Sequence, residues 1–109
     1  MKATFWQAGN ALDYQNTGNT VIEAGSVVDL NTRIGVAGTN IQPEQVGSVH
    51  VEGVFVMPKA AGAIALGAAV FYNSTAGNIT TTGGGNTPAG YAVQAAAADG
   101  VTVYVKLLG

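Results

Sequence analysis

Residues 47–59, GSVHVEGVFVMPK, carry the strongest fold signal in the chain. Apolar and polar side chains alternate along this stretch, which is the period-two pattern of a half-buried β-strand. The apolar face consists of Val49, Val51, Phe55 and Met57, and the opposite face carries Ser48, His50 and Glu52. Because a proline cannot donate to a strand ladder, we expect this strand to end at Pro58.

The C-terminal stretch 101–108, VTVYVKLL, shows the same alternation. Its apolar face comprises Val101, Val103, Val105 and Leu107, and its other face comprises Thr102, Tyr104 and Lys106. The preceding Asp99-Gly100 pair is typical of a two-residue type I′ turn. The sequence therefore predicts a hairpin between residues 91–98 and 101–107.

Shorter strand signals fill the rest of the chain, and glycine or Asn/Ser/Thr clusters separate them. These predicted strands are Thr4–Gln7, Ala11–Gln15, Val27–Leu30, Arg33–Ala37, Ala69–Asn73 and Asn78–Thr82. Only residues 60–68 and 92–98 have the alanine content of a helix, and Gly62 and Gly67 interrupt the first. We therefore predict an all-β fold, a compact small sandwich or barrel of short antiparallel strands, with at most one short helical turn near 60–66.

The sequence also contains a weak internal repeat. Residues 24–32, AGSVVDLNT, align with residues 66–74, LGAAVFYNS, and Gly35-Val36-Ala37 resembles Gly90-Tyr91-Ala92. One interpretation is a repeated unit in which a glycine precedes a strand and an Asn-Thr/Ser turn follows it. The alternative is chance similarity in a chain with 16 glycines.

Composition excludes several classes of protein. The chain has 109 residues, which suits one domain, and no cysteine for disulfides or thiolate metal sites. Its net charge is −2 and its four basic residues are dispersed, so we expect no nucleic-acid partner. The apolar run 60–72 is too short to span a bilayer, and we expect no membrane partner. Charged residues are only 9% of the chain while 48% are apolar, so other subunits are expected to cover part of the surface.

No catalytic or cofactor motif is apparent. Gly83-Gly84-Gly85 is followed by Asn86, Thr87 and Pro88, without the Lys-Ser/Thr and helix of a phosphate-binding loop, and this favours a mobile connection between strands. His50 is the only histidine, which excludes a three-histidine metal site and provides no obvious triad. The six acidic residues form no local carboxylate cluster. We therefore predict a protein that is not an enzyme and needs no cofactor or metal.

Five residues are candidates for an interaction surface. Phe5, Trp6 and Tyr14 gather near the N-terminus, as core side chains or as interface anchors. His50 and Glu52 share the polar face of one predicted strand, which faces either solvent or a partner.

Taken together, these segments resemble a known family, the capsid cement (head decoration) proteins of tailed phages. This family was formerly described only as a domain of unknown function. The resemblance covers nearly the whole chain, from ATFWQAGNALDY to VTVYVKLLG. Its most specific pieces are Gly53-Val54-Phe55 with Pro58-Lys59, the step Gly35-Val36-Ala37, and Gly67 before Val70-Phe71-Tyr72. The chain departs from the family pattern at Ala68, where that pattern has an acid after the glycine, and this departure affects one turn contact.

The resemblance implies a structural virion protein that binds the outside of the shell and stabilises it. Its implied partners are the major capsid protein and two further copies in a homotrimer, and its implied location is the capsid exterior after assembly in the host cytoplasm. The alternative is a β-sandwich binding module, such as a carbohydrate-binding one, that stacks sugars on Trp6, Tyr14 or Tyr72.

We divide the chain into an N-terminal segment, residues 1–20, and a single β domain, residues 21–109. The segment is expected to act as an arm that adds a strand to a neighbour, with Trp6 as its anchor. In the competing hypothesis, Thr4–Gln7 is an ordinary strand of its own sheet and Trp6 lies in the core.

Overall fold

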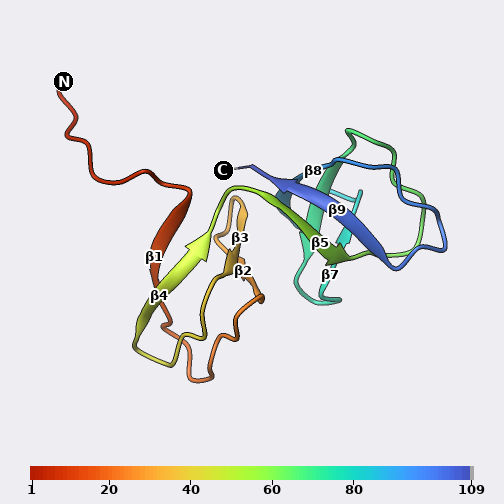
Figure 1. The fold of residues 1–109 in the computed structure, drawn as a ribbon. Coiled ribbons are helices and arrows are strands. Elements are labelled where there is room, and N and C mark those ends of the chain that lie inside the picture. Colours follow the sequence, from red (N-terminus) through yellow and green to blue (C-terminus); the bar gives the residue numbers. More distant parts are fainter. Residues whose placement is uncertain (109) are drawn as a thin grey trace.

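Nine short strands form two sheets in a computed structural model that describes residues 1–108 (Figure 1). The strands are β1 (Ala11–Gln15), β2 (Val27–Asp29), β3 (Ile34–Ala37), β4 (Val46–His50), β5 (Val54–Pro58), β6 (Ala69–Asn73), β7 (Asn78–Thr80), β8 (Thr87–Ala92) and β9 (Thr102–Leu107). No helix forms within residues 1–108, including the region near 60–66. Gly109, the last residue of the expected β domain, lies outside the described residues.

Both sheets are antiparallel. The first has the strand order β1-β4-β3-β2 and the second has the order β5-β9-β8-β6-β7. The two edges of the second sheet approach each other, because Lys59, just after β5, forms a parallel bridge with Ile79 of β7. The N–H of Ala60 then donates to the Ile79 carbonyl at 2.9 Å, so the sheet curls almost closed. The predicted all-β, sandwich-like fold is confirmed.

The predicted strand within residues 47–59 is two strands, β4 and β5, that belong to different sheets. Gly53 lies between them with a φ of 118°, a conformation that L side chains rarely adopt and that lets the chain leave one sheet for the other. The predicted faces are otherwise correct: Val49, Val51 and Met57 are buried. The alternation therefore identified the buried side of both strands but not the break between them.

The predicted C-terminal hairpin is correct only in part: the start of residues 91–98 pairs with β9, but the register and the turn differ from the prediction. β8 and β9 pair from Gly90 opposite Leu107 to Ala92 opposite Val105. The Val93 N–H still donates to the Tyr104 carbonyl at 3.0 Å, but the ladder does not continue to residue 98, because Ala96 bridges to Ile64 instead. The N–H of Gly100 donates to the carbonyl of Ala97 at 3.0 Å, so the turn spans 97–100 and lies one residue earlier than the expected type I′ pair.

The weak sequence repeat corresponds to a structural repeat. We call residues 10–52 the first half and residues 53–108 the second half. Strand order β1-β4-β3-β2 in the first half matches β5-β9-β8-β6 in the second, and β7 is the only strand without a counterpart among residues 1–108. Equivalent hydrogen bonds run from Gly25 N to Ala37 O and from Gly67 N to Ala92 O, each 2.7 Å, and equivalent bridges join Ile22 to Ile41 and Ile64 to Ala96.

Each half has its own apolar core, and the two cores differ in size. Val28, Ala37, Ile41 and Val49 form the small core of the first half. The larger cluster of the second half includes Met57, Ile64, Val70, Ile79, Val103, Val105 and Leu107, and Ile34 and Val36 of β3 pack into it as well. β3 is therefore buried on both sides, and it joins the two halves.

Two buried polar residues occupy the same place in the repeat. Asn16 and Lys59 each follow the first strand of their half, and their N–H groups donate to Gln45 O and Val101 O, both at 2.9 Å. The Asn16 side-chain amide donates to two loop carbonyls, those of Thr20 at 2.8 Å and Ile41 at 2.9 Å. The Lys59 ammonium donates to the carbonyls of Ala60, Ala98 and Gly100. Each half thus uses one buried polar side chain to hold its loops.

Candidate interaction surfaces

The first nine residues form an N-terminal arm that leaves the sheets (Figure 1). Phe5 and Trp6 are 85% and 87% exposed. Thr4–Gln7 forms no strand, so the hypothesis that places Trp6 in the core is wrong. Of the expected segment 1–20, residues 11–15 form β1 and pair with β4.

The other three candidate residues lie apart from the arm's aromatic side chains. Tyr14 is half-buried and packs against the core of the first half. His50 is exposed at the end of β4, with its ring centroid 6.4 Å from that of Phe55. Glu52 is exposed between β4 and β5. The candidates therefore divide between the arm, the first core and the junction of the two halves.

An exposed apolar surface that the candidate set missed covers the outer side of the second sheet. We call it the valine–tyrosine face; it consists of Val54 and Val56 of β5, Tyr91 of β8, and Tyr104 and Lys106 of β9. Val54 and Tyr91 lie on either side of Lys106 in the register, and Val56 lies opposite Tyr104. The Lys106 ammonium is 5.9 Å from the centroid of the Tyr91 ring, within reach of a cation–π contact.

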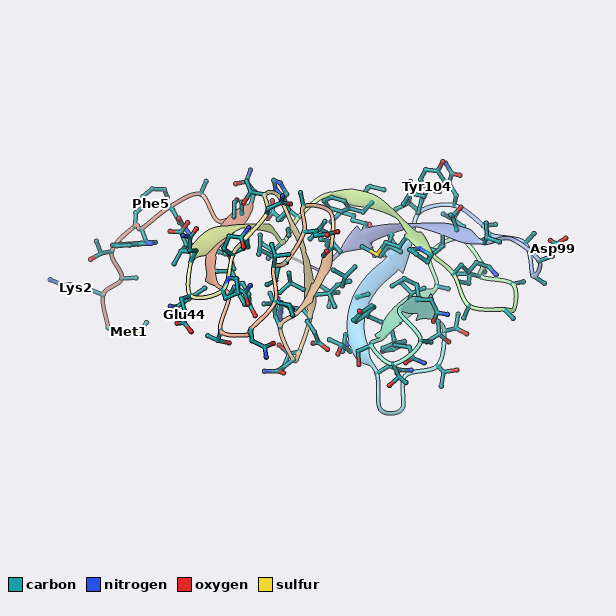
Figure 2. All side chains as sticks on the ribbon, turned by 90° about the horizontal axis from the view of Figure 1, so that it is seen from below. Met1, Lys2, Phe5, Glu44, Asp99 and Tyr104 are labelled. Carbon is teal, nitrogen blue, oxygen red and sulfur yellow. The ribbon has the colours of Figure 1, made fainter. Side chains whose placement is uncertain are left out.

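The sequence of β5 contains a pattern that indicates this surface. Val54 and Val56 alternate with the buried side of the strand, so β5 is apolar on both sides. Figure 2 shows Tyr104 on the outer side of its strand, away from the arm, which occupies the opposite end with Phe5 and Lys2. An apolar run on both sides of a strand indicates a second buried face or an interface.

Pockets, clusters of metal ligands and membrane-spanning helices are all absent among the described residues. No pocket forms among residues 1–108, and no three His, Asp or Glu side chains in this range come together as metal ligands. The glycine run 83–85 lies in the connection between β7 and β8, as expected for a link between strands. Within the same range, no helix has the length and apolarity needed to cross a membrane.

Comparison with known proteins gives one match, and it covers both halves. A family model described as "Phage cement protein" matches residues 6–107, from Trp6 of the arm to the end of β9. No curated protein and no solved structure matches the chain. The match spans almost all of the sequence, which agrees with the resemblance seen in its motifs. The chain therefore belongs to the phage cement proteins, a structural family of the phage capsid.

Proposed function

We propose that this protein binds the outer surface of a phage capsid as a homotrimer and stabilises the shell. Its partner is the major capsid protein, and it joins the capsid exterior during assembly in the host cytoplasm. The observation that carries the proposal is the family match over residues 6–107 on a chain whose arm exposes two aromatic side chains. Exposed aromatic side chains are the residue types that most often anchor protein interfaces.

The arm is suited to bind by strand addition. Thr4–Gln7 includes residues with β propensity, and no strand among residues 1–108 pairs with it. Nine extended residues reach at most about 30 Å from the start of β1, far enough to contact a neighbouring subunit. Main-chain hydrogen bonds to a partner strand then supply affinity, and Trp6 fills a pocket in that partner.

Stabilisation follows from mass action. A protein that binds the assembled shell but not its separated subunits adds RT ln(1 + [L]/Kd) per site, which is about 2.7 kcal/mol at a concentration of 100 Kd. No catalysis is needed for this effect. Closed three-fold symmetry would place three such arms around one axis, matching a three-fold or quasi-three-fold position on the shell.

A carbohydrate-binding role has less support in the geometry. Such a site needs aromatic side chains exposed in one plane. Trp6 lies on the arm, Tyr14 packs against the core of the first half, and Tyr72 packs against that of the second. These three rings belong to separate parts of the fold, and no pocket among residues 1–108 collects them.

The test uses expanded, undecorated heads of the same phage. Wild-type protein should bind them at micromolar concentration and raise their melting temperature. Trp6→Ala should weaken binding at least ten-fold, while Leu66→Ala, a control at an exposed turn position, should bind normally. Failure of the wild type to bind would refute the capsid role. Deletion of residues 2–8 with full binding retained would refute the role of the arm.

A further inference from the structure

The side chains of the valine–tyrosine face lie next to one another and form one contiguous surface. Val54 and Val56 are 52% and 56% exposed, and Tyr91 and Tyr104 are each 42% exposed. The strand register makes them neighbours across β5, β9 and β8. Isolated apolar side chains are common on protein surfaces, but a contiguous group of them marks an interaction site.

The structural repeat indicates what kind of surface this is. Val36 in β3 is the counterpart of Tyr91, because Val36 pairs with His50 as Tyr91 pairs with Lys106. In the first half this position is only 6% exposed, since Val36 packs into the core cluster of the second half. The repeat therefore presents this position twice, covered by the chain itself at Val36 and left open at Tyr91. The counterparts of Val56 and Lys106 are Asp13 and His50, which are exposed and polar, so the apolar character of the open face is specific to the second half.

The two halves also differ in charge. The first half carries five of the six acidic residues and one arginine, a formal charge of −4. The second half carries Lys59, Lys106 and Asp99, a formal charge of +1. Lys106 is the only charged residue of the valine–tyrosine face. A partner for this face is therefore expected to be apolar at its centre and acidic around it.

We propose that the valine–tyrosine face binds the acidic first half of a second copy of this chain. This head-to-tail contact places Lys106 against acidic residues, whereas a face-to-face dimer would bring two Lys106 side chains together. A head-to-tail contact also closes into a ring when its rotation is 120°, which yields three copies. The inference deepens the proposed homotrimer by naming its interface.

The experiment measures mass in solution by sedimentation equilibrium and native mass spectrometry, without any capsid. Wild-type protein should associate into a multiple of 10.9 kDa. Val56→Glu, which puts a carboxylate on the face, and Lys106→Glu should each weaken association at least ten-fold. Ser74→Glu adds the same charge in the exposed turn between β6 and β7 and should leave the mass unchanged. Thermal unfolding of each variant checks that the fold is retained.

Three outcomes would overturn the inference. A monomeric wild type at all concentrations would exclude self-association, and folded Val56→Glu with wild-type mass would exclude this face. Tighter association of Lys106→Gln, which would remove the repulsion between two ammonium groups, would indicate a face-to-face contact instead. Because no heads are present, each result is independent of whether the arm binds a capsid.

Discussion

Replacing Lys59 by methionine tests whether a buried ammonium holds the loops of the second half together. Lys59 is 8% exposed, and its Nζ donates to the carbonyls of Ala60 at 2.8 Å, Ala98 at 3.3 Å and Gly100 at 3.2 Å. Its partners belong to two segments that are distant in sequence, the connection after β5 and the turn before β9. Methionine preserves the apolar stem and removes the ammonium, with its charge and its donors.

The expected cost follows from these contacts. A hydrogen bond to a charged group contributes about 1.5–3 kcal/mol, and carbonyls left without a donor lose more when water reaches them poorly. The substitution also removes the desolvation cost of the ammonium, which offsets part of this loss. We expect the free energy of unfolding to fall by about 2–3 kcal/mol. For a chain of this length that corresponds to a decrease in Tm of about 10 °C.

The assay is reversible thermal and urea unfolding followed by circular dichroism. Lys2→Met, on the exposed arm, is the matched control and should unfold like the wild type. Hydrogen exchange should show the loss of protection centred on residues 96–101. If Lys59→Met unfolds within about 0.5 kcal/mol of the wild type, the reasoning that these three bonds stabilise the fold is refuted.

Three further predictions concern stability. Gly90→Ala should lower the free energy of unfolding by about 3 kcal/mol in urea titrations, because the φ of Gly90 is 147° and a Cβ there would collide with the Lys106 carbonyl. Gly84→Ala is the control and should be neutral, because nothing lies within 4 Å of the added Cβ. Asn16→Leu should cost about 2 kcal/mol in the same titrations, because it leaves the loop carbonyls of the first half without their donor. Deletion of residues 2–8 should leave Tm unchanged in calorimetry, and a loss of cooperative unfolding would contradict the exposed position of the arm.

Many strand positions could be predicted from local sequence, because glycine and Asn/Ser/Thr clusters mark where the short strands begin and end. Ala11–Gln15 and Ala69–Asn73 were expected with the bounds the structure gives them. Thr4–Gln7 has the same propensity but forms no strand, since no partner strand within the described residues 1–108 pairs with it. The local sequence pattern indicates which segments can form a strand. Whether a segment does so depends on a neighbouring strand with which it can pair.

Sheet membership could not be predicted in the same way. The alternation continues through residues 47–59 although Gly53 moves the chain into a second sheet. Ala96 was expected in the C-terminal hairpin, yet its bridge to Ile64 depends on a contact 32 positions away in sequence. The sequence repeat was the one long-range signal, because its aligned glycines and Gly-x-Ala steps mark equivalent hydrogen bonds in both halves.

Of the two candidate surfaces, the sequence predicted the arm but not the valine–tyrosine face. Aromatic residues near a terminus are recognisable without a fold, so Phe5 and Trp6 could be named from sequence alone. The valine–tyrosine face draws its residues from three strands, and only the register of β5, β9 and β8 brings them together.

The arm and the valine–tyrosine face depend on each other if both proposals hold. One arm of nine residues offers a small contact, and ordering it on a partner offsets much of the energy gained. Joining three arms in one ring makes the second and third contacts intramolecular, which raises the overall affinity by about 10²–10⁴-fold without any new contact. Val56→Glu leaves Phe5 and Trp6 intact but should produce monomers. Such monomers should therefore need at least about a hundred-fold higher concentration than the wild type to decorate heads in a co-sedimentation assay. If the monomer and the assembly bind heads with equal affinity, each arm binds alone, and self-association does not contribute to the affinity for the capsid.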